Sequence, residues 1–196
     1  MKILAASDLH CDHDAARAIV DAAPAADLVL LAGDFANAHE GLAEIMAILA
    51  PLGEKAILVP GNNESLEALR AATDLTVLHG QEIERAGLIV VGLGGGIPPL
   101  PDADFASWDI EEAEAERLLA PYDTCDVLLT HSPPKGVGDR HSRAGSIGSE
   151  ALREAAERMQ PGLMAFGHVH DCWGAEGTIG TSLCRNLGPG LYWADL

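Results

Sequence analysis

The sequence predicts an α/β protein in which mostly parallel strands alternate with helices. Short apolar runs rich in branched residues recur along the chain, and stretches with helical periodicity lie between them. The composition is that of a folded chain, with 48% apolar and 21% charged residues in a length of 196. A chain of this length can bury a substantial core and favours one domain, so residues 1–196 are predicted to form a single domain.

The strands are predicted where an apolar run ends in a polar tail, at residues 2–6, 28–32, 56–59, 127–130 and 163–166. The helices are predicted between them, at residues 14–23, 39–49, 65–72, 110–119 and 149–159. This alternation favours βαβ units and a parallel sheet that is buried on both faces. Residues 81–91 and 178–194 hold further strand candidates that are joined too tightly for helices. We expect these to be antiparallel additions and to contribute to a second sheet.

One long loop interrupts the alternation, at residues 92–109. It contains three consecutive glycines, Gly94 to Gly96, followed by three prolines. No Gly-Lys-Ser/Thr follows, so the loop does not match a phosphate-binding P-loop. The spacing of the glycines does not match a dinucleotide-binding fingerprint either. Long loops in compact domains are often functional. Two interpretations stay open, a surface loop and a lid over a site.

The net charge of −18 argues against large nucleic acids and anionic membranes as partners. To bind a small anionic substrate, the protein would need a region of positive electrostatic potential, supplied by a basic patch or a bound metal. The N-terminal apolar run stops at Asp8, and no later run reaches the roughly eighteen residues of a membrane span. The four cysteines form no CxxC pair. These observations predict a cytoplasmic protein with reduced thiols.

Polar side chains follow each of the five predicted strands. In open parallel sheets ligands bind at the carboxyl ends of the strands, so we expect these side chains to form one site. Three oxygen donors and four imidazoles are too many for one ion, and they suit two ions bridged by a carboxylate such as Asp34. The seven side chains are Asp8, His10, Asp34, Asn62, His131, His168 and His170.

In their order and spacing these residues resemble the motifs of the calcineurin-like metallophosphoesterases. The matching segments are Asp8-Leu9-His10, Gly33-Asp34, Gly61-Asn62-Asn63-Glu64, Thr130-His131 and Gly167-His168-Val169-His170. The resemblance implies a four-layer β-sandwich of two mixed sheets flanked by helices.

The resemblance also implies a ligand set for two divalent metal ions. Asp8, His10 and His170 would hold one ion, and Asn62, His131 and His168 would hold the other, with Asp34 bridging. Two such ions activate a hydroxide and clamp the phosphoryl oxygens during in-line attack. Nitrogen and oxygen ligands without thiolates favour manganese as the first expectation, with iron, zinc, nickel and cobalt as alternatives.

The chain departs from the family pattern at one position. The family has histidine after the ligand asparagine, where it contacts the phosphate and protonates the leaving group, whereas this chain has Asn63. An amide can donate a hydrogen bond but cannot act as an acid. Three consequences stay open: a substrate with a good leaving group, replacement by another histidine, or binding without turnover.

His141 is the best candidate for a replacing histidine. It lies between Arg140 and Arg143, which are candidates for cradling a substrate phosphate. The amides of residues 145–149 precede a predicted helix and are expected to add an anion site. The alternative is an exposed loop whose arginines pair with the acidic surface. The other residues considered are His13 and Glu64, as weaker candidates, and His39 and His79, which are assigned to structure.

The leading hypothesis is a phosphoesterase that uses two metal ions on a small phosphoester. The missing acid favours a phosphodiester, such as a cyclic nucleotide, over a general monoester. The alternative is a metal-binding scaffold or interaction protein on the same fold. The complete ligand set favours an enzyme and disfavours a hydrolase with a single ion. The oligomeric state stays open, a homodimer included.

Overall fold

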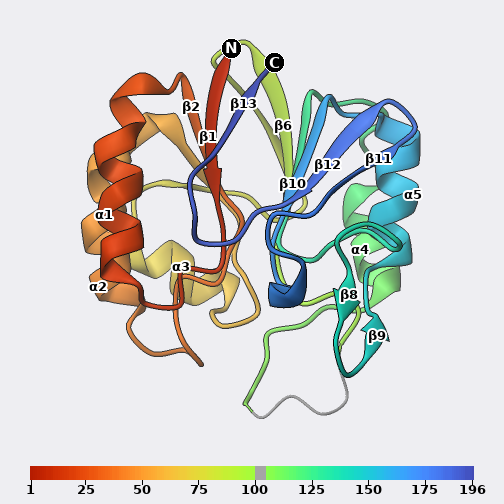
Figure 1. Cartoon of the computed structure of the whole chain (residues 1–196), viewed down its shortest axis with the longest axis horizontal. Helices are drawn as coiled ribbons and strands as arrows, with labels where there is room; N and C mark the ends of the chain where they lie inside the picture. The colour runs from red at the N-terminus through yellow and green to blue at the C-terminus, as the bar shows by residue number, and fades with distance from the viewer. Residues whose placement is uncertain (100–104) are drawn as a thin grey trace.

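The computed structural model describes residues 1–99 and 105–196. Two mixed β-sheets face each other, and helices cover the outer face of each sheet (Figure 1). This confirms the predicted α/β class and the four-layer arrangement of two mixed sheets flanked by helices.

The first sheet has the strand order β13-β1-β2-β3-β4. Strands β1 to β4 run parallel, and β13 pairs with β1 in the antiparallel direction. The strands are β1 (Lys2–Ala6), β2 (Leu28–Leu31), β3 (Ala56–Leu58), β4 (Thr76–Val77) and β13 (Tyr192–Asp195). The helices on its outer face are α1 (His13–Ala22), α2 (Leu42–Leu49) and α3 (Leu66–Ala72).

The second sheet has the strand order β11-β12-β10-β7-β6-β5. Its inner strands are parallel, and its two edges are antiparallel hairpins, as expected for residues 81–91 and 178–194. The strands are β5 (Gln81–Arg85), β6 (Leu88–Leu93), β7 (Val127–Thr130), β10 (Leu163–Phe166), β11 (Glu176–Ile179) and β12 (Ser182–Asn186). The helices on its outer face are α4 (Glu112–Leu119) and α5 (Glu150–Met159).

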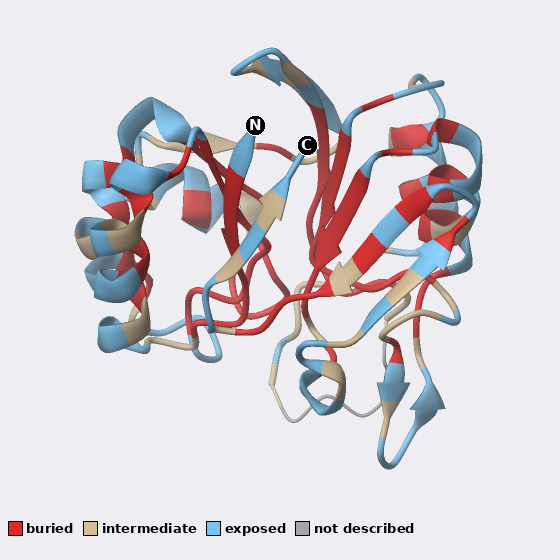
Figure 2. Ribbon diagram, turned by 45° about the horizontal axis from the view of Figure 1, so that its top comes forward, coloured by how far each residue is buried: buried red, intermediate tan, exposed pale blue. Residues whose placement is uncertain are grey.

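The core consists of three apolar layers, one between the sheets and one under each set of helices. Successive side chains of a strand point to opposite faces, so each inner strand contributes to two layers. In β2, Leu28 and Leu30 pack between the sheets, whereas Val29 and Leu31 pack under the helices. Strands β2, β3, β7 and β10 are therefore buried throughout, while the helices expose one side (Figure 2).

The structure departs from the predicted elements in three places. Strand β4 has only two residues and was too short to predict. The helix expected from residue 39 begins at Leu42, because His39 and Gly41 adopt positive φ. A small hairpin, β8 (Arg140–His141) and β9 (Gly145–Ser146), forms within a predicted loop.

The loop at residues 92–109, for which a surface loop and a lid are both open interpretations, lies partly outside the described residues. In its described parts, Gly96 pairs with Asp109 in an isolated bridge, so the two ends of the loop lie side by side. Within residues 1–99 and 105–196, no helix is both long and apolar enough to cross a membrane.

The layer between the sheets makes a prediction for stability. Leu30 is completely buried there, so we expect Leu30→Ala to lower the free energy of unfolding by about 2–5 kcal/mol through lost burial and a residual cavity. Leu183→Ala, on a side chain that is 37% exposed, should cost less than about 1 kcal/mol. Urea denaturation followed by circular dichroism measures both. Equal losses would contradict the assignment of Leu30 to the core.

Candidate metal centre

The seven side chains predicted as ligands lie together at one edge of the molecule. They follow β1, β2 and β3 of the first sheet and β7 and β10 of the second. The contacts cross between the sheets: His131 Nε2 lies 3.4 Å from Asp34 Oδ1, and His10 Nε2 lies 3.0 Å from His170 Nε2. The site is therefore assembled from both sheets.

The backbone leaves the extended conformation at these strand ends. Asp8, His10, Asp34 and His168 all have positive φ, between 42° and 69°, a region that such residues rarely adopt. Backbone hydrogen bonds hold the first two in place, from Asp8 N to Gly33 O and from His10 N to Asp34 O, each 2.9 Å long. Unfavourable backbone geometry persists only where the surroundings impose it, and here it turns the side chains into the site.

Two motif glycines are required because ligand side chains lie directly over them. A Cβ atom on Gly61 would lie 2.0 Å from Asp34 Oδ1, and one on Gly167 would lie 2.3 Å from Asp8 Oδ2. The glycines in the Gly-Asn and Gly-His motifs therefore make room for the carboxylates of other motifs.

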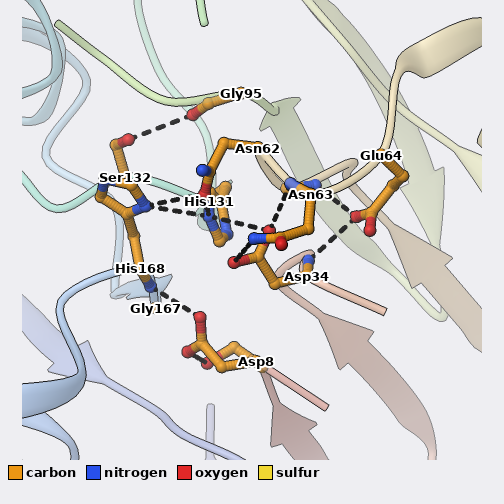
Figure 3. Close-up of polar contacts among 12 residues, drawn as sticks. Asp8, Asp34, Asn62, Asn63, Glu64, Gly95, His131, Ser132, Gly167 and His168 are labelled. Carbon is orange, nitrogen blue, oxygen red and sulfur yellow. Dashed lines mark hydrogen bonds and ion pairs between the residues drawn. The ribbon is translucent and has the colours of Figure 1, made fainter. Parts of the chain in front are cut away.

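Two imidazole nitrogens converge on the side-chain oxygen of Asn62. The Nδ1 atom of His131 lies 2.8 Å from the carbonyl oxygen of Ala32, which can only accept, so Nδ1 carries hydrogen. In the neutral ring, Nε2 then directs a lone pair at Asn62 Oδ1, 3.0 Å away. His168 Nδ1 lies 3.0 Å from the same oxygen (Figure 3). These imidazole nitrogens and the amide oxygen lie within hydrogen-bond distance of one another, and all are ligand types that divalent metals bind, so the donor set fits a divalent metal.

A second group of donors adjoins the first. One ligand atom from each of Asp8, His10, Asp34 and His170 lies within 4.8 Å of the others. Asp34 belongs to both groups, with Oδ2 3.5 Å from His10 Nε2 and Oδ1 near His131. This places Asp34 between two sites that have nitrogen and oxygen donors.

The C-terminal end of the loop at residues 92–109 orients Asn62. Its Nδ2 donates to Ser107 Oγ at 2.9 Å, and that hydroxyl donates to Asp109 Oδ1 at 2.6 Å. The Trp108 amide donates to Asn62 O. With its nitrogen held by Ser107, the Asn62 amide must present its oxygen to the site. Neither Ser107 nor Asp109 is predicted from the sequence, where nothing marks them beyond their place in the loop.

Trp173 orients Asp8. Its indole Nε1 donates to Asp8 Oδ2 at 3.1 Å, and its ring centroid lies 4.5 Å from that of His170. The amide of His168 donates to Asp8 Oδ1. Groups that orient ligands in this way commonly contribute to metal affinity. The sequence analysis missed Trp173 as well.

Glu64 joins the loops that follow β2 and β3. Its carboxylate is 1% exposed and accepts hydrogen bonds from four backbone amides, those of Asp34, Phe35, Ala36 and Gly61. Burial, and then the negative charge of Asp34, raise the pKa of Glu64 to about 7. Its oxygens face the backbone, so Glu64 positions the ligand loops.

Asn63 also faces Asp34. Its Nδ2 donates to Asp34 Oδ2 and its Oδ1 accepts from the amide of Ala38, both at 2.8 Å. Its backbone amide donates to Asp34 Oδ1 at 2.9 Å. The amide predicted to contact substrate is therefore engaged with the central carboxylate.

Charge within the site sets the protonation of its members. Burial alone would raise the pKa of Asp34, but positive charge on His131 and His10 outweighs it and lowers that pKa. Burial, and then His131, lower the pKa of His168 to about 3, so its imidazole is neutral and able to ligate. For His131, burial lowers the pKa, but Asp34 and Asp8 outweigh burial and raise it.

A cavity of about 540 Å³ opens over the ligands. Of the residues predicted to contact substrate, Asn63, His141 and Arg143 line it, whereas Arg140 is exposed and lies outside its lining. Its remaining lining is Asn37, Phe105, Ser142, Ile147 and Asp171, together with the ligand residues His10, Asp34, Asn62, His168 and His170.

The anion site expected at residues 145–149 is not available. The carboxylate of Glu112 accepts hydrogen bonds from the amides of Glu150 and Ala151, and from the hydroxyl of Ser149. An acidic side chain of the protein itself therefore occupies the N-terminus of α5. Within the predicted segment, the amides of Ile147 and Ser149 donate to the carbonyl oxygens of Asp139 and Pro133, and that of Gly148 donates to Asp139 Oδ2, so these three amides are not free for an anion. His13 and His39 are exposed, and His79 is half-buried.

Comparison with known proteins assigns the family. The model of the calcineurin-like phosphoesterases matches residues 1–172, so the chain belongs to this family. The chain is 30% identical over 140 residues to the human metallophosphoesterase domain-containing protein 1, which covers 65% of this chain and 40% of that protein. The chain thus spans about two fifths of the length of this relative.

Solved structures share the fold at low identity. The protein TT1561 of Thermus thermophilus superposes with a TM-score of 0.76 at 19% identity, covering 99% of this chain and 98% of that one. A dimetal phosphatase from Danio rerio superposes with a TM-score of 0.67 at 14% identity, covering 96% and 88%.

The contacts of Glu64 predict a large loss of stability on its removal. Glu64→Ala leaves four buried amides without an acceptor, so we expect the free energy of unfolding to fall by about 3–5 kcal/mol. Glu67→Ala, on the exposed face of α3, should change it by less than about 0.5 kcal/mol. Chemical denaturation of the metal-free proteins measures both. A loss below about 1 kcal/mol in Glu64→Ala would show that the loops hold without it.

The raised pKa of His131 predicts that acid weakens metal binding. A raised pKa keeps the proton on the ring up to a higher pH than in an ordinary histidine, and this proton competes with the ion. Below that pKa the affinity for Mn²⁺ should rise about tenfold for each pH unit, if one proton is displaced. Calorimetric titration with Mn²⁺ between pH 6 and 8.5 measures this. An affinity independent of pH would contradict ligation by His131.

Proposed function

We propose that this protein is a phosphoesterase that uses two divalent metal ions to hydrolyse a small phosphoester. The observation that carries the proposal is the convergence of two imidazole nitrogens, from His131 and His168, on Asn62 Oδ1, beside the group formed by Asp8, His10, Asp34 and His170. Asp8, His10 and His170 would hold one ion, and Asn62, His131 and His168 the other, with Asp34 shared. Manganese is the first expectation because the donors are nitrogen and oxygen only.

Two ions held there would neutralise the phosphoryl oxygens and activate water as the nucleophile. The chain's own residues perform the remaining tasks. Asp34 lies between the two ligand groups and fixes their relative position. Asn63 holds the side chain of Asp34 and Glu64 holds its backbone amide through hydrogen bonds. Arg143 and His141 line the cavity and are placed to bind substrate oxygens. The acidic surface and the cavity of about 540 Å³ favour a small substrate.

A phosphodiester is the proposed class in preference to a general monoester. The family acid is replaced by Asn63, whose amide is engaged with Asp34 and Ala38. A poor leaving group that depends on protonation at this position would therefore be hydrolysed slowly.

Substrate preference and metal dependence are tested together. Protein loaded with Mn²⁺ should hydrolyse bis-p-nitrophenyl phosphate faster than p-nitrophenyl phosphate, with two ions bound per chain by elemental analysis. Asp34→Asn and His168→Ala should each lower kcat/KM by about a hundredfold or more, because each removes a metal ligand. His13→Ala, at an exposed histidine outside the site, is the matched control and should retain activity.

Two outcomes would oppose the proposal. Tight binding of Mn²⁺ with no turnover of either ester, or of cyclic nucleotides, would favour a metal-binding scaffold on the same fold. One ion per chain, with activity that survives Asp34→Asn, would reject a shared carboxylate and favour a hydrolase with a single ion.

A further inference from the structure

We infer that this site hydrolyses phosphoesters whose leaving group departs without receiving a proton from the protein, and that His141 assists as a neutral hydrogen-bond donor. The inference rests on the proposed function for its chemistry. Its structural basis is the β8–β9 hairpin (Figure 1), where His141 and the turn residues Ser142 and Arg143 line the cavity.

Among the described residues that line the cavity, His141 is the one remaining candidate for a proton donor. The other histidines there belong to the ligand groups. Arg143 is a permanent cation. The carboxylate of Asp171 is occupied in holding the turn, because its Oδ2 accepts a hydrogen bond from the Ser142 amide. Glu64, close behind Asp34, is buried and has both oxygens on backbone amides.

The ring of His141 is fixed by its own turn. Its Nδ1 accepts hydrogen bonds from the amides of Arg143 and Ala144, each at 3.2 Å. A ring nitrogen that accepts carries a lone pair, so the hydrogen of this imidazole is on Nε2. An imidazolium needs hydrogen on both nitrogens, which would set the Nδ1 hydrogen against two amide hydrogens. His141 therefore offers a neutral Nε2–H.

The surrounding contacts hold the turn in this form. The Ser142 amide donates to Asp171 Oδ2 at 2.8 Å, so three consecutive amides of the turn already have side-chain acceptors. At the base of the hairpin, Asp139 Oδ2 accepts from Gly136 N at 2.9 Å and from the hydroxyl of Ser146. The turn therefore has no free amide for a phosphate at these positions, and binding of the substrate oxygens is left to the side chains of His141 and Arg143.

A neutral imidazole can stabilise negative charge while retaining its proton, because it donates a hydrogen bond without being a strong acid. In the resulting step, the oxygen of a deprotonated water forms a bond to phosphorus, and the bond from phosphorus to the leaving oxygen breaks. The electron pair stays on the leaving oxygen, which departs as an anion and takes a proton from solvent afterwards. This step is fast for esters of acidic hydroxyls, such as phenols and enols, and slow for esters of unstrained sugar hydroxyls.

The protonation of His141 is measured directly, without turnover. Long-range ¹H–¹⁵N spectra of histidine-labelled protein loaded with diamagnetic Zn²⁺ separate the two neutral forms and the imidazolium. The spectrum of His141→Gln identifies the signal, which we expect to show hydrogen on Nε2 alone near pH 7.5. Hydrogen on Nδ1, in either the other neutral form or the imidazolium, would overturn the inference even if the protein has no activity.

Departure of the leaving group without a proton from the protein is tested with aryl methyl phosphodiesters. Their leaving phenols have pKa values from about 5 to about 10. With Mn²⁺ bound, kcat should fall by about three- to tenfold for each unit of leaving-group pKa. His141→Gln, which keeps an N–H donor, should have a lower rate and the same slope. A shallow slope that steepens in His141→Gln would show proton donation and overturn the inference. Turnover of none of these esters would count against the proposed function, while the spectra still decide the state of His141.

Discussion

The site depends on one buried carboxylate that holds two loops together. The carboxylate of Glu64 accepts hydrogen bonds from four backbone amides. Three of these amides belong to the loop that carries Asp34 and one to the loop that carries Asn62. A buried carboxylate is costly unless its oxygens are satisfied, and here both are satisfied by groups that must be ordered for ligation. The same contacts that make Glu64 tolerable in the interior also set the position of Asp34, around which the remaining donors are arranged.

Each ligand group takes members from both sheets. Asp8, His10, Asp34 and Asn62 follow strands of the first sheet, and His131, His168 and His170 follow strands of the second. The core layer between the sheets consists of apolar packing, which has no directional preference. An ion at this edge would link the two halves through directional bonds, so its binding energy would also resist separation of the sheets.

The sequence predicted the fold class, and its motifs pointed to the side chains that now lie together, because both depend on local patterns. Apolar runs mark buried strands, and polar residues directly after them mark one edge of a sheet. The orienting contacts escaped prediction because they join distant segments: Trp173 donates to Asp8 across 165 positions, and Ser107 lies on a loop without regular periodicity. The β8–β9 hairpin was missed because Asp139 and Asp171, rather than strand propensity, hold it. Arg140 was grouped with Arg143 by proximity in sequence, although only Arg143 lines the cavity.

The indole of Trp173 gives the site an optical label of its own. Its ring lies against His170, its N–H is bonded to Asp8, and 41% of the residue is exposed. Trp108 lies beside His79, and Trp193 lies on strand β13 under the Lys2 ammonium group, so the three indoles have different surroundings. Paramagnetic ions quench nearby indole emission. Binding of Mn²⁺ or Co²⁺ at the centre would therefore lower the intrinsic fluorescence of the protein, which can be followed without substrate or added dye.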